Sequence, residues 1–236
     1  MKQLQCDAVI FDLDGVLVDS MVVIERHWRQ WAIQHNFDAA EIMRVAHGRR
    51  TVETIRLVAP HLDAEVEAAR FEAGEAVDTD GLVRIDGAAR LVHSLPRDSW
   101  AVATSCTRGT AMTRLRYAGL PVPTVLVTAD DVKQGKPDPE AYLLASERLD
   151  VAPEWCLVVE DALAGIEAAH AAGMRVIAVA TTHAQEELES ADAVVACFSD
   201  IQILPKSYES KSSEKLPNMP MVRHEAVRVA VETGIS

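Results

Sequence analysis

Polar side chains capable of chemistry follow several apolar runs of this sequence, either directly after the run or in the loop that comes next. The residues in these positions are Asp12, Asp14, Thr104, Ser105, Lys136, Glu160 and Asp161. In such a set one carboxylate can act as a nucleophile and a second as acid and base, while a lysine and a hydroxyl hold phosphoryl oxygens as charge spreads over them. The set therefore predicts phosphoryl transfer through an aspartyl-phosphate.

The carboxylates of this set also predict a metal ion. Asp12 and Asp14 are two positions apart, so in extended backbone their side chains face the same way, within about 7 Å. Glu160 and Asp161 add negative charge, which would raise the pKa of at least one carboxyl group unless a cation is bound. Because all these candidate ligands offer oxygen atoms, we expect a hard divalent ion, and Mg2+ is the usual choice where substrate phosphate is also met.

Each position has an ordinary structural interpretation when it is taken alone. An Asp-x-Asp after a strand is often a turn, a Thr-Ser or Glu-Asp pair often caps a helix, and a single lysine such as Lys136 is often a solvated loop residue. The catalytic interpretation is favoured because all the positions occur in order at successive strand ends. In an open parallel sheet, ligands bind beyond the carboxyl ends of the strands.

The elements that would position these residues are apolar runs of strand length, mostly without alternation, as in strands buried on both faces. The runs are Ala8–Phe11, Trp100–Ala103, Val125–Val127, Cys156–Val159, Val176–Ala180 and Ala193–Cys197. Segments of helical character lie between the later runs, at 109–118, 139–149 and 163–172. This alternation predicts β-α-β units, a parallel sheet and thus an α/β fold.

Residues 20–84 interrupt this pattern, because they contain several helical stretches and no comparable apolar run. The residues on one stripe of the first helix are Ile24, Trp28, Trp31 and His35. We expect a helical cap at 20–84, inserted between two parts of a catalytic core at 1–19 and 85–204. A flexible or irregular C-terminal tail is expected at 205–236, although the valines at its positions 227, 229 and 231 alternate as in a short strand.

The composition excludes several classes of function. The 236 residues carry a formal net charge of -13, which argues against binding to nucleic acid or to anionic membranes. The 4 cysteines lie far apart without a C-x-x-C pair, so neither a zinc site nor a disulfide framework is indicated. We find neither a signal peptide nor a run of about 18 apolar residues. A cytoplasmic protein is therefore expected, with a monomer favoured.

The motifs at the strand ends resemble those of the haloacid dehalogenase-like hydrolases. The corresponding stretches are Asp12–Ser20, Val102–Ser105, Lys136–Pro139 and Val159–Asp161. The resemblance covers residues 6–200 and implies a Rossmann-like, doubly wound parallel sheet with an inserted helical cap and Mg2+-dependent hydrolysis. Members that cleave carbon–halogen or carbon–phosphorus bonds lack the second aspartate, so Asp14 argues for phosphate esters.

The resemblance also implies a role for each carboxylate. Asp12 would be the nucleophile, and Asp14 would protonate the leaving oxygen and later activate water. The metal ion would lie between the Asp12 carboxylate, the backbone carbonyl of Asp14 and Asp161, with Glu160 nearby. These four residues are therefore our candidate metal ligands.

The phosphate would be held by Lys136 and one hydroxyl, from Thr104 or Ser105, and the sequence leaves that choice open. Residues 46–56 look like the branch that dephosphorylates small sugar and polyol phosphates, including glycerol and deoxysugar phosphates, although Cys106 replaces the usual glycine of that branch. The cap residues expected to reach the substrate are His47, Arg49 and Arg50. The alternative interpretation of these three residues is an exposed basic helix start.

Together these features predict a Mg2+-dependent phosphatase that hydrolyses small sugar or polyol phosphate monoesters. One alternative is a phosphosugar mutase similar to β-phosphoglucomutase, which would use the same two aspartates but pass the phosphoryl group to a sugar hydroxyl instead of water. Another is a non-enzymatic protein that binds phosphorylated metabolites. In each case the expected partner is a small phosphorylated metabolite.

Overall fold

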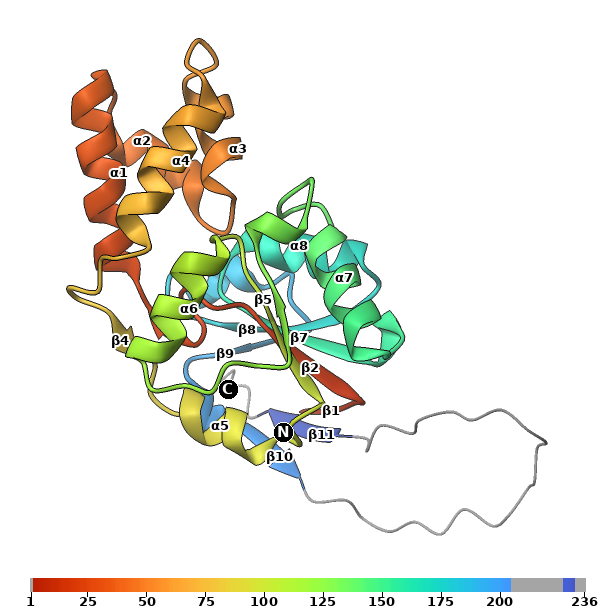
Figure 1. The fold of residues 1–236 in the computed structure, drawn as a ribbon. Coiled ribbons are helices and arrows are strands. Elements are labelled where there is room, and N and C mark those ends of the chain that lie inside the picture. The colour runs from red at the N-terminus through yellow and green to blue at the C-terminus, as the bar shows by residue number, and fades with distance from the viewer. Residues whose placement is uncertain (1, 205–226, 232–236) are drawn as a thin grey trace, which may run out of the picture.

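The computed structural model describes residues 2–204 and 227–231, and its centre is a six-stranded parallel sheet (Figure 1). The strands are β6 (Val125–Val127), β5 (Trp100–Ala103), β2 (Ala8–Phe11), β7 (Cys156–Glu160), β8 (Arg175–Val179) and β9 (Ala193–Val195), in this spatial order. Each strand forms where the sequence predicts one. From β2 the chain first adds strands on one side and then on the other. The strand order therefore reverses at β2, where such sheets bind ligands.

Helices cover both faces of this sheet. They are α5 (Ala88–Ser94) and α6 (Arg108–Tyr117) on one face, and α7 (Glu140–Leu149) and α8 (Leu163–Ala171) on the other. Successive residues of a strand point to opposite faces, so Val9 and Phe11 pack with α5 and α6 while Ala8 and Ile10 pack with α7 and α8. Burial on both sides explains the apolar runs without alternation and confirms the predicted α/β fold.

Four helices lie beyond the end of the sheet at which β2 stops (Figure 1). They are α1 (Met21–His35), α2 (Ala39–Ala46), α3 (Thr51–Val58) and α4 (Ala64–Glu75). Their buried side chains, among them Trp28, Trp31 and Phe71, form an apolar cluster of their own. Where the chain enters and leaves these helices, β3 (Val18–Asp19) pairs antiparallel with β4 (Val83–Arg84), which the sequence did not indicate. We refer to residues 20–84 as the cap; its boundaries stay a prediction.

A second, antiparallel sheet lies at the other end of the molecule (Figure 1). Its strands are β1 (Lys2–Cys6), β11 (Val227–Val231) and β10 (Ile201–Leu204), with β11 in the middle. The expectation of an irregular segment from 205 to 236 is therefore wrong for residues 227–231, where the alternating valines had indicated a strand. The rest of that segment lies outside the described residues.

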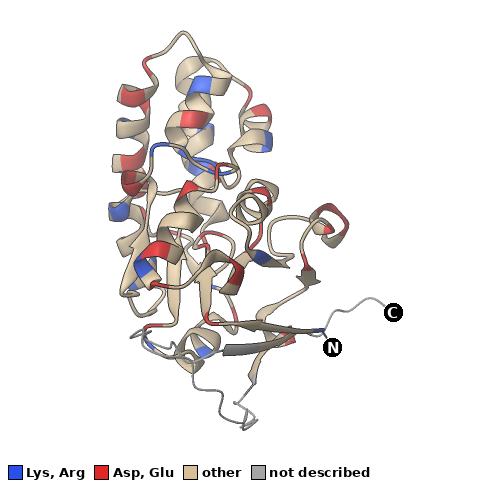
Figure 2. Ribbon diagram, turned by 90° about the vertical axis from the view of Figure 1, so that its right-hand side faces the viewer, with Lys and Arg blue, Asp and Glu red and all other residues tan. Residues whose placement is uncertain are grey.

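Charged residues are spread over the molecule. Figure 2 shows acidic residues along both the cap helices and the core, with basic ones interspersed among them. Across residues 2–204 and 227–231, we find no helix that is long and apolar enough to cross a lipid bilayer.

Candidate active site

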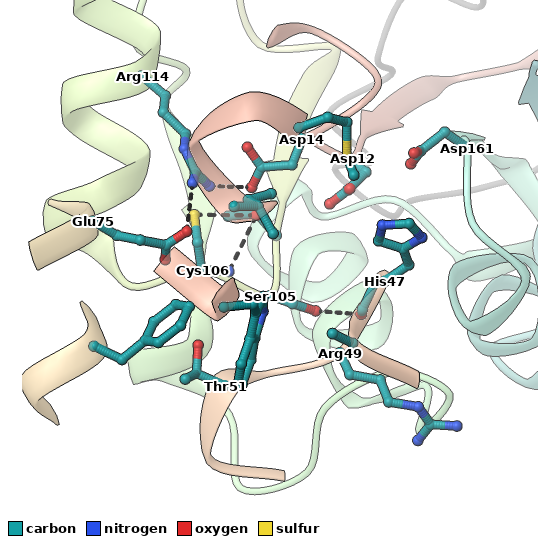
Figure 3. A pocket seen from close by; sticks show the side chains of 17 residues that line it. Asp12, Asp14, His47, Arg49, Thr51, Glu75, Ser105, Cys106, Arg114 and Asp161 are labelled. Carbon is teal, nitrogen blue, oxygen red and sulfur yellow. Dashed lines mark hydrogen bonds and ion pairs between the residues drawn. The ribbon is translucent and has the colours of Figure 1, made fainter. Parts of the chain in front are cut away.

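The polar strand ends meet at a small cavity between the parallel sheet and the cap (Figure 3). The core residues predicted for the site that line it are Asp12, Asp14, Thr104, Ser105 and Asp161. From the cap, His47 and Arg49 also line it. The cavity volume is ≈ 70 Å³, so the cap leaves little open space above the carboxylates.

Lys136 lies directly behind this cavity and holds two carboxylates. Its ammonium nitrogen is 2.9 Å from Asp12 Oδ1 and 2.6 Å from Glu160 Oε1, and its side chain is only 1% exposed. An ammonium buried this deeply requires such partners, because an unpaired buried charge is strongly destabilising. Lys136 therefore fixes the orientation of Asp12 at the cavity wall.

Glu160 connects Lys136 to the turn that carries Asp161. Its Oε1 accepts a hydrogen bond from the Tyr142 hydroxyl at 2.8 Å, and its Oε2 accepts from the backbone N–H groups of Asp161 and Ala162 at 2.8 and 3.0 Å. A Cβ at position 165 would overlap the Glu160 carboxylate, so Gly165 leaves the room that this arrangement needs. Glu160 thus positions both Lys136 and the neighbouring aspartate.

The carboxylates fit a divalent cation. One oxygen each from Asp12, Glu160 and Asp161 lie within 4.8 Å of one another, and all three residues are buried. Three ionised carboxylates with the one ammonium of Lys136 leave an excess of two negative charges. Burial raises the pKa of Asp12 to about 7 and raises the pKa of Asp161 well above its usual value, because no counter-charge matches this excess. A hard divalent ion at these oxygens supplies the missing charge.

Space beside Asp161 depends on a glycine. Gly15 has a φ of +75°, and a Cβ at this position would overlap the Asp161 carboxylate. On its other side the Asp161 carboxylate accepts a hydrogen bond from the Thr182 hydroxyl at 2.5 Å. The glycine after Asp14 therefore has a direct role in bringing the ends of β2 and β7 together.

Asp14 lines the same cavity as Asp12, but its carboxylate has partners of its own. The strand β2 ends at Phe11, and the chain then turns, so that the Leu13 carbonyl accepts from the N–H groups of Leu17 and Val18 at 2.9 Å each. Asp14 Oδ1 accepts from the Ser20 hydroxyl at 2.6 Å, and Oδ2 lies 2.5 Å from a guanidinium nitrogen of Arg114. The Asp12 and Asp14 carboxylates line the same cavity but are held by different partners.

The two candidate hydroxyls make different contacts. Ser105 Oγ donates to the carbonyl of Gly48 in the cap at 2.7 Å, whereas Thr104 Oγ1 lies 3.3 Å from both the thiol and the N–H of Cys106. Burial raises the pKa of Cys106 well above its usual value, so its thiol stays protonated and is no nucleophile. The choice between Thr104 and Ser105 as phosphate ligand stays open.

The three cap residues predicted to reach the substrate differ in how they lie relative to the cavity. The His47 ring is directed toward Asp161 in Figure 3, and burial lowers its pKa. Its Nε2 is buried and has no hydrogen-bond partner within residues 2–204 and 227–231. Arg49 lines the cavity, but its guanidinium points away from the aspartates. Arg50 is not brought to the cavity, because it donates to the carbonyls of Val132 and Lys133 at 2.8 Å each and fastens the cap to the loop before Lys136.

Sequence reasoning missed several polar residues around the cavity. They are Ser20, Glu75, Arg114, Tyr142 and Thr182. Thr182 follows the predicted strand Val176–Ala180 by two positions, as Asp161 follows Cys156–Val159, whereas the others acquire their partners through helix packing or chain reversal. The place after a strand could have indicated Thr182, and the Asp12–Ser20 stretch already ends at Ser20. No signal in a single sequence distinguishes Glu75, Arg114 and Tyr142 from ordinary helix or loop residues.

The sequence profile for haloacid dehalogenase-like hydrolases matches residues 9–179. The chain belongs to this family. It is 39% identical over 205 residues to hexitol phosphatase A of Escherichia coli (strain K12), covering 85% of this chain and 95% of that protein. It is 37% identical over 194 residues to glycerol-1-phosphate phosphohydrolase 2 of Saccharomyces cerevisiae, covering 76% of each.

A solved structure shows a similar arrangement. CbbY from Rhodobacter sphaeroides, crystallised in complex with phosphate, superposes with a TM-score of 0.70 at 27% sequence identity, covering 83% of this chain and 96% of that chain. The haloacid dehalogenase-like fold, with its parallel sheet and helical layers, is thus shared along most of both chains. Membership of this family confirms the resemblance expected from the strand-end motifs.

Proposed function

We propose that this chain is a Mg2+-dependent phosphatase that hydrolyses small sugar or polyol phosphate monoesters. The observation that carries the proposal is the buried Lys136 ammonium, which holds the Asp12 carboxylate at the cavity wall beside Asp161. The named activities of the two relatives, on hexitol phosphate and glycerol 1-phosphate, support this substrate class. The family and the acidic cluster support a divalent ion, and Mg2+ is the ion we propose.

Asp12 attacks the phosphorus of the ester in the first step. The bond between an Asp12 oxygen and phosphorus forms as the bond to the substrate oxygen breaks, and Asp14 gives its proton to that leaving oxygen. In the second step a water molecule loses a proton to Asp14 and attacks the same phosphorus. The bond to Asp12 then breaks and releases inorganic phosphate.

The remaining groups hold charge and position during both steps. Lys136 keeps Asp12 oriented, and it offsets charge on the phosphoryl oxygens together with the hydroxyl of Thr104 or Ser105. The carboxylates of Asp12 and Asp161 and the carbonyl of Asp14 would hold Mg2+, with Glu160 behind them. When bound, Mg2+ supplies positive charge that lets the phosphate approach the carboxylates.

The shape of the cavity supports small substrates. Its volume of ≈ 70 Å³ is well below the roughly 300 Å³ at the lower end of ordinary ligand pockets, so the cap must move to admit a substrate. Trp28, Phe71 and Ile24 of the cap form an apolar wall of the cavity. Closure of this wall over a small metabolite would exclude water from the cavity. A folded phosphoprotein is too large for the cap to close over it.

Phosphate release from a panel of monophosphates, with Mg2+ present, tests this proposal. We expect hexitol and glycerol phosphates to be hydrolysed, and the Asp12→Asn variant to lose at least about 10³-fold in turnover. Asp7→Asn is the matched control, because Asp7 directly precedes β2 and so lies at the end of this strand opposite to Asp12. Full activity of Asp12→Asn would remove Asp12 from the nucleophile role.

The same experiment distinguishes the alternatives. Isomerised sugar phosphate without released phosphate would establish the mutase, and binding without any turnover across the panel would establish a non-enzymatic binder. The monomeric state and the cytoplasmic location stay predictions. Light scattering of the purified protein tests the first of these.

A further inference from the structure

A chain of three charged side chains, two of them buried, connects the cap to the active-site aspartate that follows β2. One guanidinium nitrogen of Arg114, on α6, lies 2.5 Å from Asp14 Oδ2, and another lies 2.9 Å from Glu75 Oε1, at the end of α4 (Figure 3). The side chains of Arg114, Glu75 and Asp14 are 2%, 6% and 18% exposed. The same guanidinium therefore contacts the core and the cap at once.

Stability alone does not account for this arginine. A buried ion pair contributes little over well-packed apolar residues of similar volume, and Arg114 lies on α6 between the buried apolar residues Ala111 and Leu115. Among the described residues, the hydrogen-bonding partners of its guanidinium are Asp14 and Glu75. Both line the active-site cavity. The buried guanidinium therefore acts on two residues of the active-site cavity, and we look for its role there.

We propose that Arg114 is a positioning residue, which aligns Asp14 for proton transfer and does so fully only when Glu75 of the closed cap completes the guanidinium's contacts. This inference rests on the proposed phosphatase function. The Ser20 hydroxyl holds Asp14 Oδ1 at 2.6 Å, so Arg114 supplies the second of two fixed contacts to this carboxylate. Two contacts from different elements, one to each oxygen, fix the orientation of a carboxylate, whereas a single contact leaves it free to rotate.

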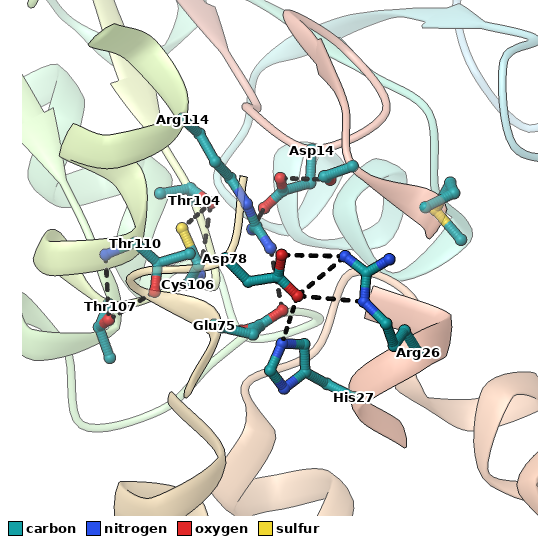
Figure 4. Close-up of polar contacts among 12 residues, drawn as sticks. Asp14, Arg26, His27, Glu75, Asp78, Thr104, Cys106, Thr107, Thr110 and Arg114 are labelled. Atoms are coloured by element: carbon teal, nitrogen blue, oxygen red, sulfur yellow. Dashed lines mark hydrogen bonds and ion pairs between the residues drawn. The ribbon is translucent and has the colours of Figure 1, made fainter. Parts of the chain in front are cut away.

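Glu75 is itself held in place by the cap. Asp78, three residues later in the chain, accepts hydrogen bonds from Arg26 Nε at 3.1 Å and lies 3.0 Å from His27 Nε2, both on α1 (Figure 4). These contacts fasten the end of α4 to α1. Movement of the cap as a unit would therefore carry Glu75 away from Arg114, and Asp14 would be aligned only over an enclosed substrate.

The leaving group of the substrate provides a readout that a general structural defect would not change. An alcohol leaves as an alkoxide and needs a proton from Asp14, whereas p-nitrophenolate is stable without one. Regeneration of Asp12 by water needs Asp14 for both substrates. Poor alignment of Asp14 therefore slows the first step only for the alcohol ester, and slows the second step for both.

The test compares the Mg2+-loaded wild-type protein with Arg114→Gln, using rapid mixing with a hexitol phosphate and with p-nitrophenyl phosphate. We expect Arg114→Gln to slow first-turnover release of the hexitol about 10²-fold. First-turnover release of p-nitrophenol should stay within about threefold of wild type and appear as a burst before a slow steady state. Arg116→Gln, an exposed arginine of the same helix, should behave as wild type.

Two further variants keep the test decisive if Arg114→Gln does not fold. Arg114→Lys retains a charge that reaches one carboxylate only, and Glu75→Gln retains an oxygen that can still accept from Arg114. Each should give the same pattern with a loss of about tenfold. Equal slowing of both first turnovers, or no slowing of hexitol release, would overturn the inference. Absence of hydrolysis by the wild-type protein would instead contradict the proposed function.

Discussion

At the scale of single residues, the site is an excess of negative charge that the protein has not neutralised by itself. Lys136 matches one of the three clustered carboxylates, and burial raises the pKa of Asp161, with the nearby Glu160 and Asp12 adding to this effect. A carboxyl group with a raised pKa binds protons more tightly in the folded than in the unfolded state. Ionisation of Asp161 therefore lowers the stability of the metal-free protein as the pH rises above 3.8, the pKa of an aspartate in the unfolded chain.

The variant Asp161→Asn should separate metal binding from folding stability. Without metal at pH 7.5, we expect it to be more stable than the wild type by roughly 1–2 kcal/mol, because the unfavourable buried charge is gone. With Mg2+ the order should reverse, because the wild type gains stability by binding the ion and the variant gains much less. Thermal melts in EDTA and in Mg2+ measure both effects, with Asp7→Asn as the control. A metal-dependent gain in Asp161→Asn equal to that of the wild type would contradict Asp161 as a ligand.

The residues proposed for the chemistry were accessible from the sequence because their position is local. Asp12, Thr104 and Glu160 each end an apolar run or directly follow one, and parallel strands bring these ends to one edge. Arg114 and Glu75 were not accessible. They are separated by 39 residues and meet only through the packing of α4 against α6, which no pattern in either helix indicates.

At the scale of elements, the contact between cap and core carries an unfavourable charge. Glu72 lies on α4, one turn before Glu75, and burial raises its pKa to about 7, with Glu75 and Asp130 adding to this effect. The folded state thus binds more protons than the unfolded state between pH 4.5 and 7. Ionised Glu72 destabilises the protein above this range and has no such effect below it.

The variant Glu72→Gln should therefore stabilise the protein at high pH. Because Glu72 is only partly buried, we expect a gain of about 1 kcal/mol at pH 8 and none at pH 4.5. Urea denaturation at both pH values measures this difference. Glu65→Gln, on the exposed side of the same helix, should give no gain at pH 8, because Arg56 lowers the pKa of Glu65. An equal gain at both pH values would show that the effect of Glu72 is not electrostatic.

The predictability of the elements follows from how local their stabilisation is. The strand Ala8–Phe11 and its parallel neighbours were predicted, since burial on both faces requires continuous apolar runs. The short antiparallel pair of β3 (Val18–Asp19) and β4 (Val83–Arg84) was not predicted, because a strand of two residues shows no periodicity. Its pairing also depends on where the cap begins and ends. β1 was missed for a similar reason, since its partner lies more than two hundred residues away.

At the scale of the whole molecule, the parallel sheet carries the candidate active site and the antiparallel sheet contributes to the stability of the core. The parallel sheet ends at the cap and the cavity, whereas the antiparallel sheet lies at the opposite end (Figure 1). Leu4, Ile201, Val229 and Val231 of the antiparallel sheet are buried in the same apolar core as α5. The antiparallel sheet therefore supports the core beneath the strands without reaching the reacting groups.

Removal of β11 should consequently lower stability and leave catalysis unchanged. A chain that ends at residue 226 loses the middle strand of the antiparallel sheet, including Val229 and Val231, which are 2% and 0% exposed. We expect its free energy of unfolding to fall by at least about 3 kcal/mol, at 1.5–3 kcal/mol for each fully buried valine. A chain that ends at residue 231 keeps the strand and is the matched control. Urea denaturation gives the stability, and kcat per folded molecule at low temperature should equal that of the full chain. A fall in kcat without a loss of stability would contradict this division between the two sheets.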